Sequence, residues 1–409
     1  MPSKWRVVAM LWCISFFNYA DRQAIFSVFP LLQRELHLSA VQLGLLGSGF
    51  AWVYGLAAPL AGLVVDRASR RRVILGGLHA WSLICMATAA SRTFVHLVLF
   101  RAAEGLGETF YFPASTSLIS DYHDAGTRSR ALGLHQTSVY MGTIGGGFFA
   151  GLIAERYGWR VSFIVFGALG VLLGLVLRRS LLEPARGAAD LPSSAVRPPA
   201  SAVRPPLALV CLFLAFMCAN FVAVVLLSWM PAFLFDRFHM SLAMAGLTAT
   251  VFVQVASMAG AATGGWLADW WRRRSPAGRI GVQAVGMLAG APFVLVCGLT
   301  PSVLVLAIAL TCWGFFKGLY DANIFAAAFD LVPPEARGRT AGLMNMIGWL
   351  AGGGSAPVVI GFVADRSSLG AALALTSIVY VAAGALLVLA MFMTPRASSP
   401  AVNQLPGGA

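Results

Sequence analysis

Long apolar stretches recur along the whole chain, with short polar segments between them. Each is about twenty residues long, enough for an α-helix to cross the hydrocarbon layer of a bilayer. The first six predict spans over residues 5–30, 41–65, 73–91, 94–120, 129–154 and 160–178. The last six predict spans over residues 207–234, 243–268, 280–298, 302–330, 339–364 and 370–393. The pattern therefore predicts an all-α membrane protein with twelve transmembrane helices.

A segment of different composition separates the two groups of six spans. Residues 180–206 are rich in Pro, Ala, Ser and Arg, and they repeat one hexapeptide at 194–199 and 201–206. Such a polar, proline-containing segment is typical of a linker. We therefore expect an N-terminal six-helix bundle, a cytoplasmic linker, a C-terminal six-helix bundle and a disordered tail, over residues 1–179, 180–206, 207–395 and 396–409.

Four short motifs of the first half recur in the second half in the same order, roughly 203 to 213 residues later. The matched segments are 62–71 with 265–273, 105–108 with 318–321, 128–133 with 337–342, and 154–156 with 364–366. Two related halves with a site between them are the arrangement of a transporter in which the halves rock against each other. The repeat thus predicts two pseudo-symmetric six-helix bundles.

Composition and charge support a membrane location. The chain is 58% apolar and 11% charged, whereas soluble domains carry about 25% charge. Its net charge of +13 comes from short clusters between spans and not from a basic stripe, so we expect no nucleic-acid partner. With both termini and the linker in the cytoplasm, twenty Lys and Arg fall on that side and six on the other. We expect a multi-pass, monomeric protein of the cell inner membrane with the lipid bilayer around it.

Several spans carry ionisable side chains where lipid would disfavour them. One charge at the centre of a membrane helix costs roughly 2.5–3.5 kcal/mol on insertion scales, so these groups should face one another or a hydrated cavity. Helical spacing puts the charges of the fourth span on one face and those of the tenth span on one face. The charged residues are Asp21 and Arg22 in the first span, with the polar Asn18 near them, Arg101, Glu104 and Glu108 in the fourth, and Lys317 and Asp321 in the tenth.

We assign roles to these residues by charge. A carboxyl group with a competing arginine can be protonated when unpaired and ionised when paired, so Asp21 and Glu108 are candidate proton carriers. Arg22, Arg101 and Lys317 are candidate anchors for an anionic substrate. The wider substrate-binding set adds Asp321, Asn18, Glu104, Gln136 and Asn345. The alternative is that the charges form structural ion pairs, including one between Arg101 and Glu104.

The sequence indicates no cofactor and no metal. The six cysteines lie inside apolar stretches without ligand spacing. Glycine-rich segments at 142–147 and 352–354 lie inside spans and follow no strand, so they do not predict a nucleotide site. No nucleophile–base or metal constellation indicates an enzyme. We expect transport to be driven by the proton gradient.

The segment from Gly62 to Arg71 resembles the signature loop between the second and third spans of the major facilitator superfamily. The resemblance extends over nearly the whole chain and implies the major facilitator fold. It also implies a cytoplasmic gate in which the loop and its second copy join the two halves. The gate residues would be Gly62, Asp66, Arg67, Arg70 and Arg71, with Asp269 and Arg272 from the second copy.

Residues 18–22, together with Arg101, Glu104 and Glu108, resemble two branches of that superfamily. One contains anion:cation symporters that take up sugar acids, and the other contains bacterial spinster-like transporters of lysophospholipids and sphingoid lipids. Both imply protonatable groups at Asp21 and Glu108 beside Arg101.

We therefore expect a secondary active, proton-coupled transporter that moves a small organic anion, a sugar acid or other carboxylate, by alternating access. The alternatives are a spinster-like lipid exporter and a non-transporting membrane sensor. A hydrophobic opening between the fifth and eighth spans would favour lipids, and a closed polar cavity would favour sugar acids.

Overall fold

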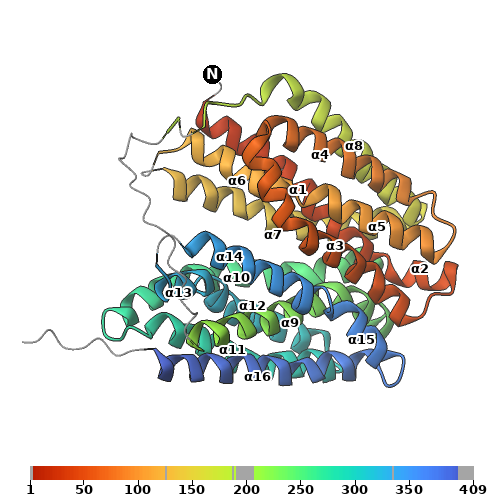
Figure 1. Cartoon of the computed structure of the whole chain (residues 1–409). Helices are drawn as coiled ribbons and strands as arrows, with labels where there is room; N and C mark the ends of the chain where they lie inside the picture. Colours follow the sequence, from red (N-terminus) through yellow and green to blue (C-terminus); the bar gives the residue numbers. More distant parts are fainter. Residues whose placement is uncertain (1–2, 125–126, 187, 190–206, 334–335, 395–409) are drawn as a thin grey trace, which may run out of the picture.

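The computed structural model describes residues 3–124, 127–186, 188–189, 207–333 and 336–394 (Figure 1). Over these residues the chain is helical and contains no strand. The first half consists of α1 (Lys4–Ser27), α2 (Phe29–Leu36), α3 (Ala40–Arg67), α4 (Arg70–Thr88), α5 (Phe94–Glu108), α6 (Tyr111–Tyr122), α7 (Arg128–Tyr157) and α8 (Trp159–Ser180). The second half consists of α9 (Leu207–Phe238), α10 (Leu242–Arg272), α11 (Gly278–Leu299), α12 (Val303–Asp321), α13 (Ile324–Asp330), α14 (Arg337–Ile347), the π-helix η2 (Gly348–Gly353), α15 (Ala356–Ala364) and α16 (Leu369–Met393).

These helices form the twelve expected spans in two layers, α1–α8 and α9–α16 (Figure 1). Nine helices in the described part of the chain are long and apolar enough to cross a membrane. The other three expected spans are the first, third and fourth. The first and fourth carry charges at mid-span, and the third begins with three arginines.

Serine and threonine side chains begin many of the helices. In each case the hydroxyl accepts a hydrogen bond from a backbone N–H of the first turn, which has no partner inside the helix. Ser39 and Gln42 form a reciprocal capping box at the start of α3. The other capping residues are Ser3, Ser69, Thr93, Ser241, Ser302 and Ser368.

The fourth and tenth spans were expected to be continuous helices, but each is broken. Pro113 has no N–H to donate to the carbonyl of Thr109, so the helix cannot continue smoothly from α5 into α6. In the tenth span the side chain of Asn323 donates to the carbonyl oxygen of Leu319 at 3.0 Å, where the next helical bond would form. The breaks follow Glu108 and Asp321, which occupy equivalent positions in the repeat.

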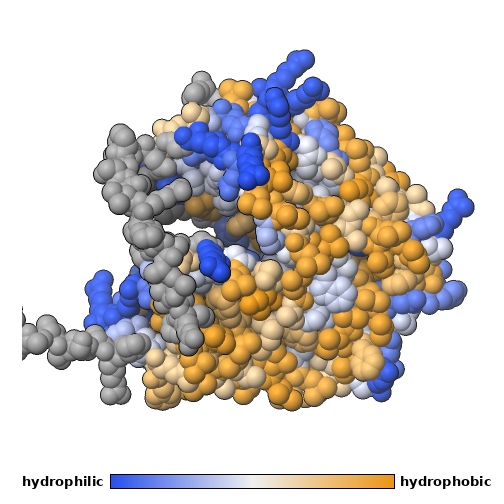
Figure 2. All heavy atoms as spheres, viewed as in Figure 1, coloured by the Kyte–Doolittle hydropathy of each residue, from blue (hydrophilic) through white to orange (hydrophobic). Residues whose placement is uncertain are grey.

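The start of α1, the end of α8 and the end of α16 lie at one end of the bundle, which we call the termini side (left in Figure 1). The opposite end, the far side, holds the start of α3, the start of α10 and the end of α15. Apolar side chains cover most of the visible face between the two ends (Figure 2). Leu56, Leu60 and Leu63 of α3 are each more than half exposed, as expected for side chains in contact with lipid.

On the far side the two halves touch backbone to backbone. A Cβ atom on Gly246 of α10 would lie 2.0 Å from the carbonyl oxygen of Gly147 of α7. A Cβ atom on Gly44 of α3 would lie 2.3 Å from the carbonyl oxygen of Pro357 of α15. Small residues permit this close packing of membrane helices. Asp365 adds a polar contact, because its carboxylate accepts the amides of Ala40 at 3.0 Å and of Val41 at 3.2 Å.

On the termini side the halves stand apart. A Cβ atom added at Gly62, Gly133, Gly265 or Gly342 would meet nothing within 4 Å. Figure 2 shows the surface hollowed between the two layers at this end. The structure is therefore closed on the far side and open on the termini side.

The proposed domain boundaries stay a prediction. The helix that ends the first half stops at Ser180, and α9 begins at Leu207. Most of the expected linker, residues 190–206, and the expected tail, residues 396–409, lie outside the described residues.

Candidate functional site

A cavity of about 660 Å³ lies between the two halves. Its volume is within the range of about 300–1,000 Å³ that small-molecule sites occupy. One wall comes from α1, α3, α5, α6 and α7, and the other from α9, α10, α12, α13 and η2. Five residues that the sequence singled out line this central cavity: Arg22, Arg101, Gln136, Lys317 and Asp321.

Arg22 of α1 lies in the wall of the first half. Its Nε donates a hydrogen bond to Oε2 of Glu108, the last residue of α5. Its Cζ atom lies 4.7, 5.1 and 4.6 Å from the ring centres of Tyr19, Phe50 and Tyr54. Such cation–π contacts hold a guanidinium against an apolar wall. Its Nη1 is buried and has no hydrogen-bond partner among the described residues.

Arg101 of α5 shares one of these rings. Its Cζ atom lies 4.7 Å from the ring centre of Phe50, so this ring contacts both guanidinium groups. Nη1 of Arg101 donates to Oε2 of Glu104, one turn along the same helix. The structure therefore pairs Arg101 with Glu104 and Arg22 with Glu108, whereas helical spacing alone had placed Glu108 with Arg101.

Asp21 lies behind this wall inside the first half. It is 1% exposed, and neither carboxylate oxygen has a hydrogen-bond partner within the described ranges. The same holds for both side-chain atoms of the buried Asn18. An unpaired buried polar group is costly, so a region with several of them is unusual for a part of the fold that serves packing alone.

Asp21, Cys85 and Glu104 each offer a ligand atom within 4.8 Å of the other two. The set fits a metal ion poorly. Hard cations prefer oxygen ligands to a thiol, and Arg101 already places a positive charge on Glu104. We therefore assign no metal to this cluster.

Lys317 and Asp321 form the charged part of the opposite wall. Nζ of Lys317 donates to Oδ2 of Asp321 one turn further along α12. The side chains are 16% and 35% exposed. The remaining described side chains of the second half that line the cavity carry no charge, and Asn220 and Gln254 are polar among them.

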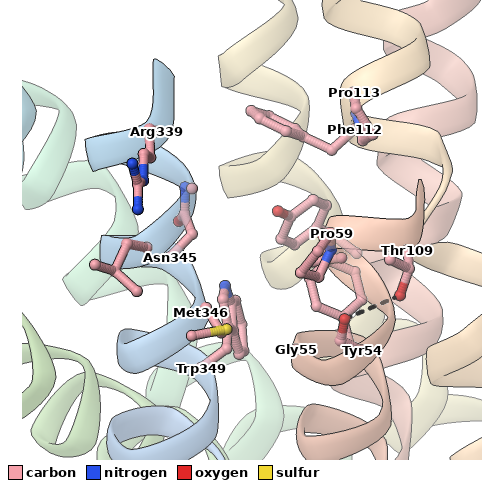
Figure 3. A pocket seen from close by; sticks show the side chains of 14 residues that line it. Tyr54, Gly55, Pro59, Thr109, Phe112, Pro113, Arg339, Asn345, Met346 and Trp349 are labelled. Atoms are coloured by element: carbon pink, nitrogen blue, oxygen red, sulfur yellow. Dashed lines mark hydrogen bonds between the residues drawn. The ribbon is translucent and has the colours of Figure 1, made fainter. Parts of the chain in front are cut away.

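A second cavity of about 570 Å³ opens between α3 and α6 on one side and α14 on the other. Figure 3 shows Arg339, Asn345 and Met346 facing Pro59 and Phe112 across it. It shares lining residues with the central cavity, namely Tyr19, Phe112 and Trp349. The two cavities are therefore adjacent, and this access cavity leads toward the termini side.

The expected substrate-binding residues thus divide into three groups. Arg22, Arg101, Gln136, Lys317 and Asp321 line the central cavity. Asn345 lines the access cavity. The remaining two, Asn18 and Glu104, lie in the first half behind the cavity wall, as do both proposed proton carriers, Asp21 and Glu108.

The first gate loop makes its ion pairs inside its own half. Arg70 pairs with Asp121 of α6 and with Glu183, which follows α8. Arg71 donates to the carbonyl oxygen of Arg178. Gly62 has open space beside it, and Asp66 and Arg67 form no ion pair with another described residue. Among the described residues, the first gate loop forms no ion pair with the second half.

The second loop repeats this arrangement. Arg272 pairs with Asp330 at 3.1 Å, and Arg279 pairs with Asp269 at 3.3 Å and with Asp330 at 3.0 Å. Asp330 ends α13 as Asp121 lies near the end of α6, 209 residues earlier. Each loop therefore forms ion pairs within its own half. The first connects α4 to α6, and the second connects α10 and α11 to α13.

Glu183 caps the start of α4 from the beginning of the linker. Its carboxylate accepts the amide of Arg70 at 2.8 Å and the hydroxyl of Ser69. Burial raises the pKa of this carboxyl, but the hydrogen bonds from Ser69 and Arg70 outweigh burial and leave the pKa lowered from its ordinary value. Glu183 is therefore held in its ionised form against the helix start.

Several lining residues escaped the sequence analysis. Tyr54, Phe50 and Trp349 contact the cationic groups or each other, and Gln23 and Gln254 add polar groups to the central cavity. Aromatic residues occur throughout membrane helices, so their type alone does not mark a cavity. Of these residues, only Gln23 could have been identified from sequence, because it directly follows the charged Arg22 in α1.

Comparisons with known proteins identify the family of this chain. The family profile of the Major Facilitator Superfamily matches residues 11–353. A hexuronate transporter of Bacillus subtilis is 25% identical, over 98% of this chain and 96% of its own. A probable galactarate/D-glucarate transporter of Escherichia coli is 24% identical, over 88% and 87% of the two chains. Protein spinster of Drosophila melanogaster is 24% identical, over 89% of this chain and 62% of its own.

The fold is also that of a solved protein. A bacterial homolog of the human lysosomal transporter Spinster, in an inward-facing and unoccupied conformation, superposes with a TM-score of 0.80. It is 23% identical, and 96% of each chain is covered. The family match spans most of the sequence and confirms the predicted major facilitator fold, and the helices are consistent with twelve spans. The chain is a multi-pass membrane transporter and belongs to the Major Facilitator Superfamily.

Proposed function

We propose that this protein moves small organic anions across the cell inner membrane by alternating access, coupled to protons. The observation that carries the proposal is Arg22, held in the cavity wall with Glu108 as its only anion in the described structure. A substrate carboxylate is chemically equivalent to the carboxylate that Arg22 already binds. The two can compete for the same guanidinium.

This competition supplies a route to proton coupling. When a substrate carboxylate binds Arg22, Glu108 loses its cation in a poorly hydrated site and is more stable with a proton. When the substrate leaves, Glu108 returns to Arg22 and releases that proton. Asp21, which has no partner of its own among the described residues, is the second proton carrier in this proposal.

Alternating access accounts for the asymmetric packing of the halves. The contacts of Gly147 with Gly246 and of Asp365 with α3 close the far side, while the termini side is open. With the termini placed in the cytoplasm by the distribution of Lys and Arg, this is an inward-facing state. Rocking of the halves would separate the far-side contacts and bring the gate loops together.

The names of the relatives fit a sugar acid or other carboxylate as substrate. Hexuronates and aldarates are hydroxylated carboxylates, and the polar side chains of Gln23, Gln136 and Gln254 in the central cavity suit their hydroxyl groups. The chain belongs to a superfamily of transporters, and no observation on the described residues favours a non-transporting sensor.

A lipid with an anionic head is the second candidate, and one observation favours it. The access cavity is lined largely by apolar side chains, including Leu343, Met346 and Phe112, which suit an acyl chain. The opening expected for lipid between the fifth and eighth spans is absent at the far side, where α7 and α10 touch. The polar lining of the central cavity makes the small anion the better-supported substrate.

The test is uptake of D-glucuronate into proteoliposomes under an imposed pH gradient. We expect accumulation by the wild type, and no accumulation but continued substrate exchange by Asp21→Asn and Glu108→Gln. Glu155→Gln, at an exposed acid of α7, is the matched control and should behave as wild type. Unchanged accumulation in both Asp21→Asn and Glu108→Gln would remove the coupling assignment. Competition by lysophosphatidylglycerol but by no carboxylate would establish the lipid alternative.

A further inference from the structure

The proposed mechanism uses the charges of the first half and leaves one charged pair without a role. Lys317 and Asp321 lie in the cavity wall formed by the second half. Asp321 ends α12 at the helix break, as Glu108 ends α5, and the two acids are 213 residues apart in the repeat. In each half, therefore, a cation that lines the shared cavity is paired with the acidic residue that precedes the helix break.

Stability is a poor explanation for the second pair. Ion pairs that keep contact with water contribute only about 0–1 kcal/mol to folding stability, and the Asp321 side chain is 35% exposed. An ionisable residue inside a membrane span is by default a functional one.

The position of the pair indicates what it would bind. Lys317 is the single cation of the second half among the described residues that line the cavity, and it faces the same space as Arg22 and Arg101. Its only ion-pair partner in the described structure, Asp321, is 35% exposed and can be hydrated once displaced. An anion in the cavity therefore meets one exchangeable cation in each half.

We propose that Lys317 binds a second acidic group of the substrate, so that the preferred substrate is a dicarboxylate that spans the cavity from Arg22 to Lys317. This inference rests on the proposed function and adds the substrate class. One carboxylate replaces Glu108 at Arg22, and the other replaces Asp321 at Lys317. A dianion contacts both halves through charge-assisted hydrogen bonds, whereas a monoanion satisfies one cation and leaves the other with its internal acid.

The test compares D-glucarate with D-gluconate, which share carbons 1 to 5 and differ in a carboxylate or a hydroxymethyl group at carbon 6. Binding to purified protein is measured by calorimetry and by the rise in melting temperature. For the wild type we expect D-glucarate to bind about tenfold or more tightly than D-gluconate, as for one additional charge-assisted contact.

Two variants isolate the role of Lys317. Lys317→Gln combined with Asp321→Asn removes both charges while leaving a neutral pair that can still hydrogen bond. We expect the preference for D-glucarate to fall below about twofold, because the variant loses far more affinity for D-glucarate than for D-gluconate. Lys317→Arg keeps the charge and should keep the preference. Saturable binding of D-gluconate by the double variant also shows that the protein is folded.

The outcomes separate this inference from the proposed function. Equal affinity of the wild type for the two acids, or an undiminished preference in the double variant, would overturn the inference alone. An equal loss of affinity for both acids in the double variant would assign the pair to structure and overturn it too. A wild type that binds neither acid, nor D-glucuronate, would overturn the proposed function together with the inference.

Discussion

Replacing Gly246 with alanine is expected to open the far side of the protein. The new Cβ atom would lie 2.0 Å from the carbonyl oxygen of Gly147 and 3.1 Å from Oγ of Ser27. The nearest atom belongs to backbone and cannot rotate away, so α7 and α10 must move apart. Overpacking of this kind costs about 1–3 kcal/mol. The penalty applies only while the far side is closed, so the closed population should fall about five- to 150-fold relative to other states.

Hydrogen–deuterium exchange measured by mass spectrometry checks this expectation without added labels. In Gly246→Ala, peptides at the starts of α3 and α10 should exchange faster, and peptides of α13 and α14 on the termini side should exchange more slowly. Gly76→Ala is the matched control, because Gly76 lies on α4 with nothing within 4 Å of an added Cβ atom. If Gly246→Ala exchanged like Gly76→Ala and wild type at both ends, the glycine contact would not be the far-side seal, and the alternating-access argument would lose its structural basis.

Two further perturbations test the polar contacts at either end. Asp365→Ala removes the acceptor of the Ala40 and Val41 amides, a helix cap worth about 0.5–2 kcal/mol, so exchange at the start of α3 should rise about two- to 30-fold; no change would show that Asp365 does not hold the far side closed. Glu183→Gln should lower the melting temperature at pH 7, because the lowered pKa of Glu183 means that its ionised form stabilises the fold above the unfolded value of about 4.3. The difference from wild type should vanish as pH falls through the lowered native pKa, and a difference that persists in acid would mean that Glu183 acts without its charge.

Much of the fold could be predicted from sequence because the bilayer imposes strong rules. Apolar stretches of sufficient length must be helices, since no other continuous backbone satisfies its hydrogen bonds in lipid. The breaks after Glu108 and Asp321 were missed because the apolar pattern continues through them. A proline such as Pro113 or an asparagine side chain such as that of Asn323 can interrupt one backbone hydrogen bond without changing the apolar pattern. The π-helix at Gly348–Gly353 is invisible to hydropathy for the same reason.

The sequence indicated which residues belong to the candidate site better than it indicated which of them form ion pairs. Charges inside spans are conspicuous, and Arg22, Arg101 and Lys317 do line one cavity. Helical spacing tells which side chains of one helix share a face, but not which helix lies opposite. It therefore placed Arg101 with Glu104 on one face and Lys317 with Asp321 on another. It did not indicate the pair of Arg22 with Glu108 across two helices.

The predicted cytoplasmic gate shows a second limit of prediction from sequence, which is the conformational state of the protein. The loop motif indicates which residues act at the termini side, but not in which state they meet. In the present open state the arginines of the loop bind acids of their own half, including Asp121 and Glu183. Contact between Asp66 and the second half belongs to the opposite state in the proposed cycle and stays a prediction.

The exchange of a proton for a carboxylate at Arg22 can be measured directly as proton uptake on binding. Purified protein in weakly buffered detergent is mixed with saturating D-glucarate between pH 5 and pH 9, and a pH indicator reports the protons consumed. We predict uptake that approaches one proton per protein within this range through Glu108, and markedly less uptake in Glu108→Gln although the anion still binds. Calorimetrically verified binding with no proton uptake at any pH, or with equal uptake by wild type and Glu108→Gln, would contradict the account.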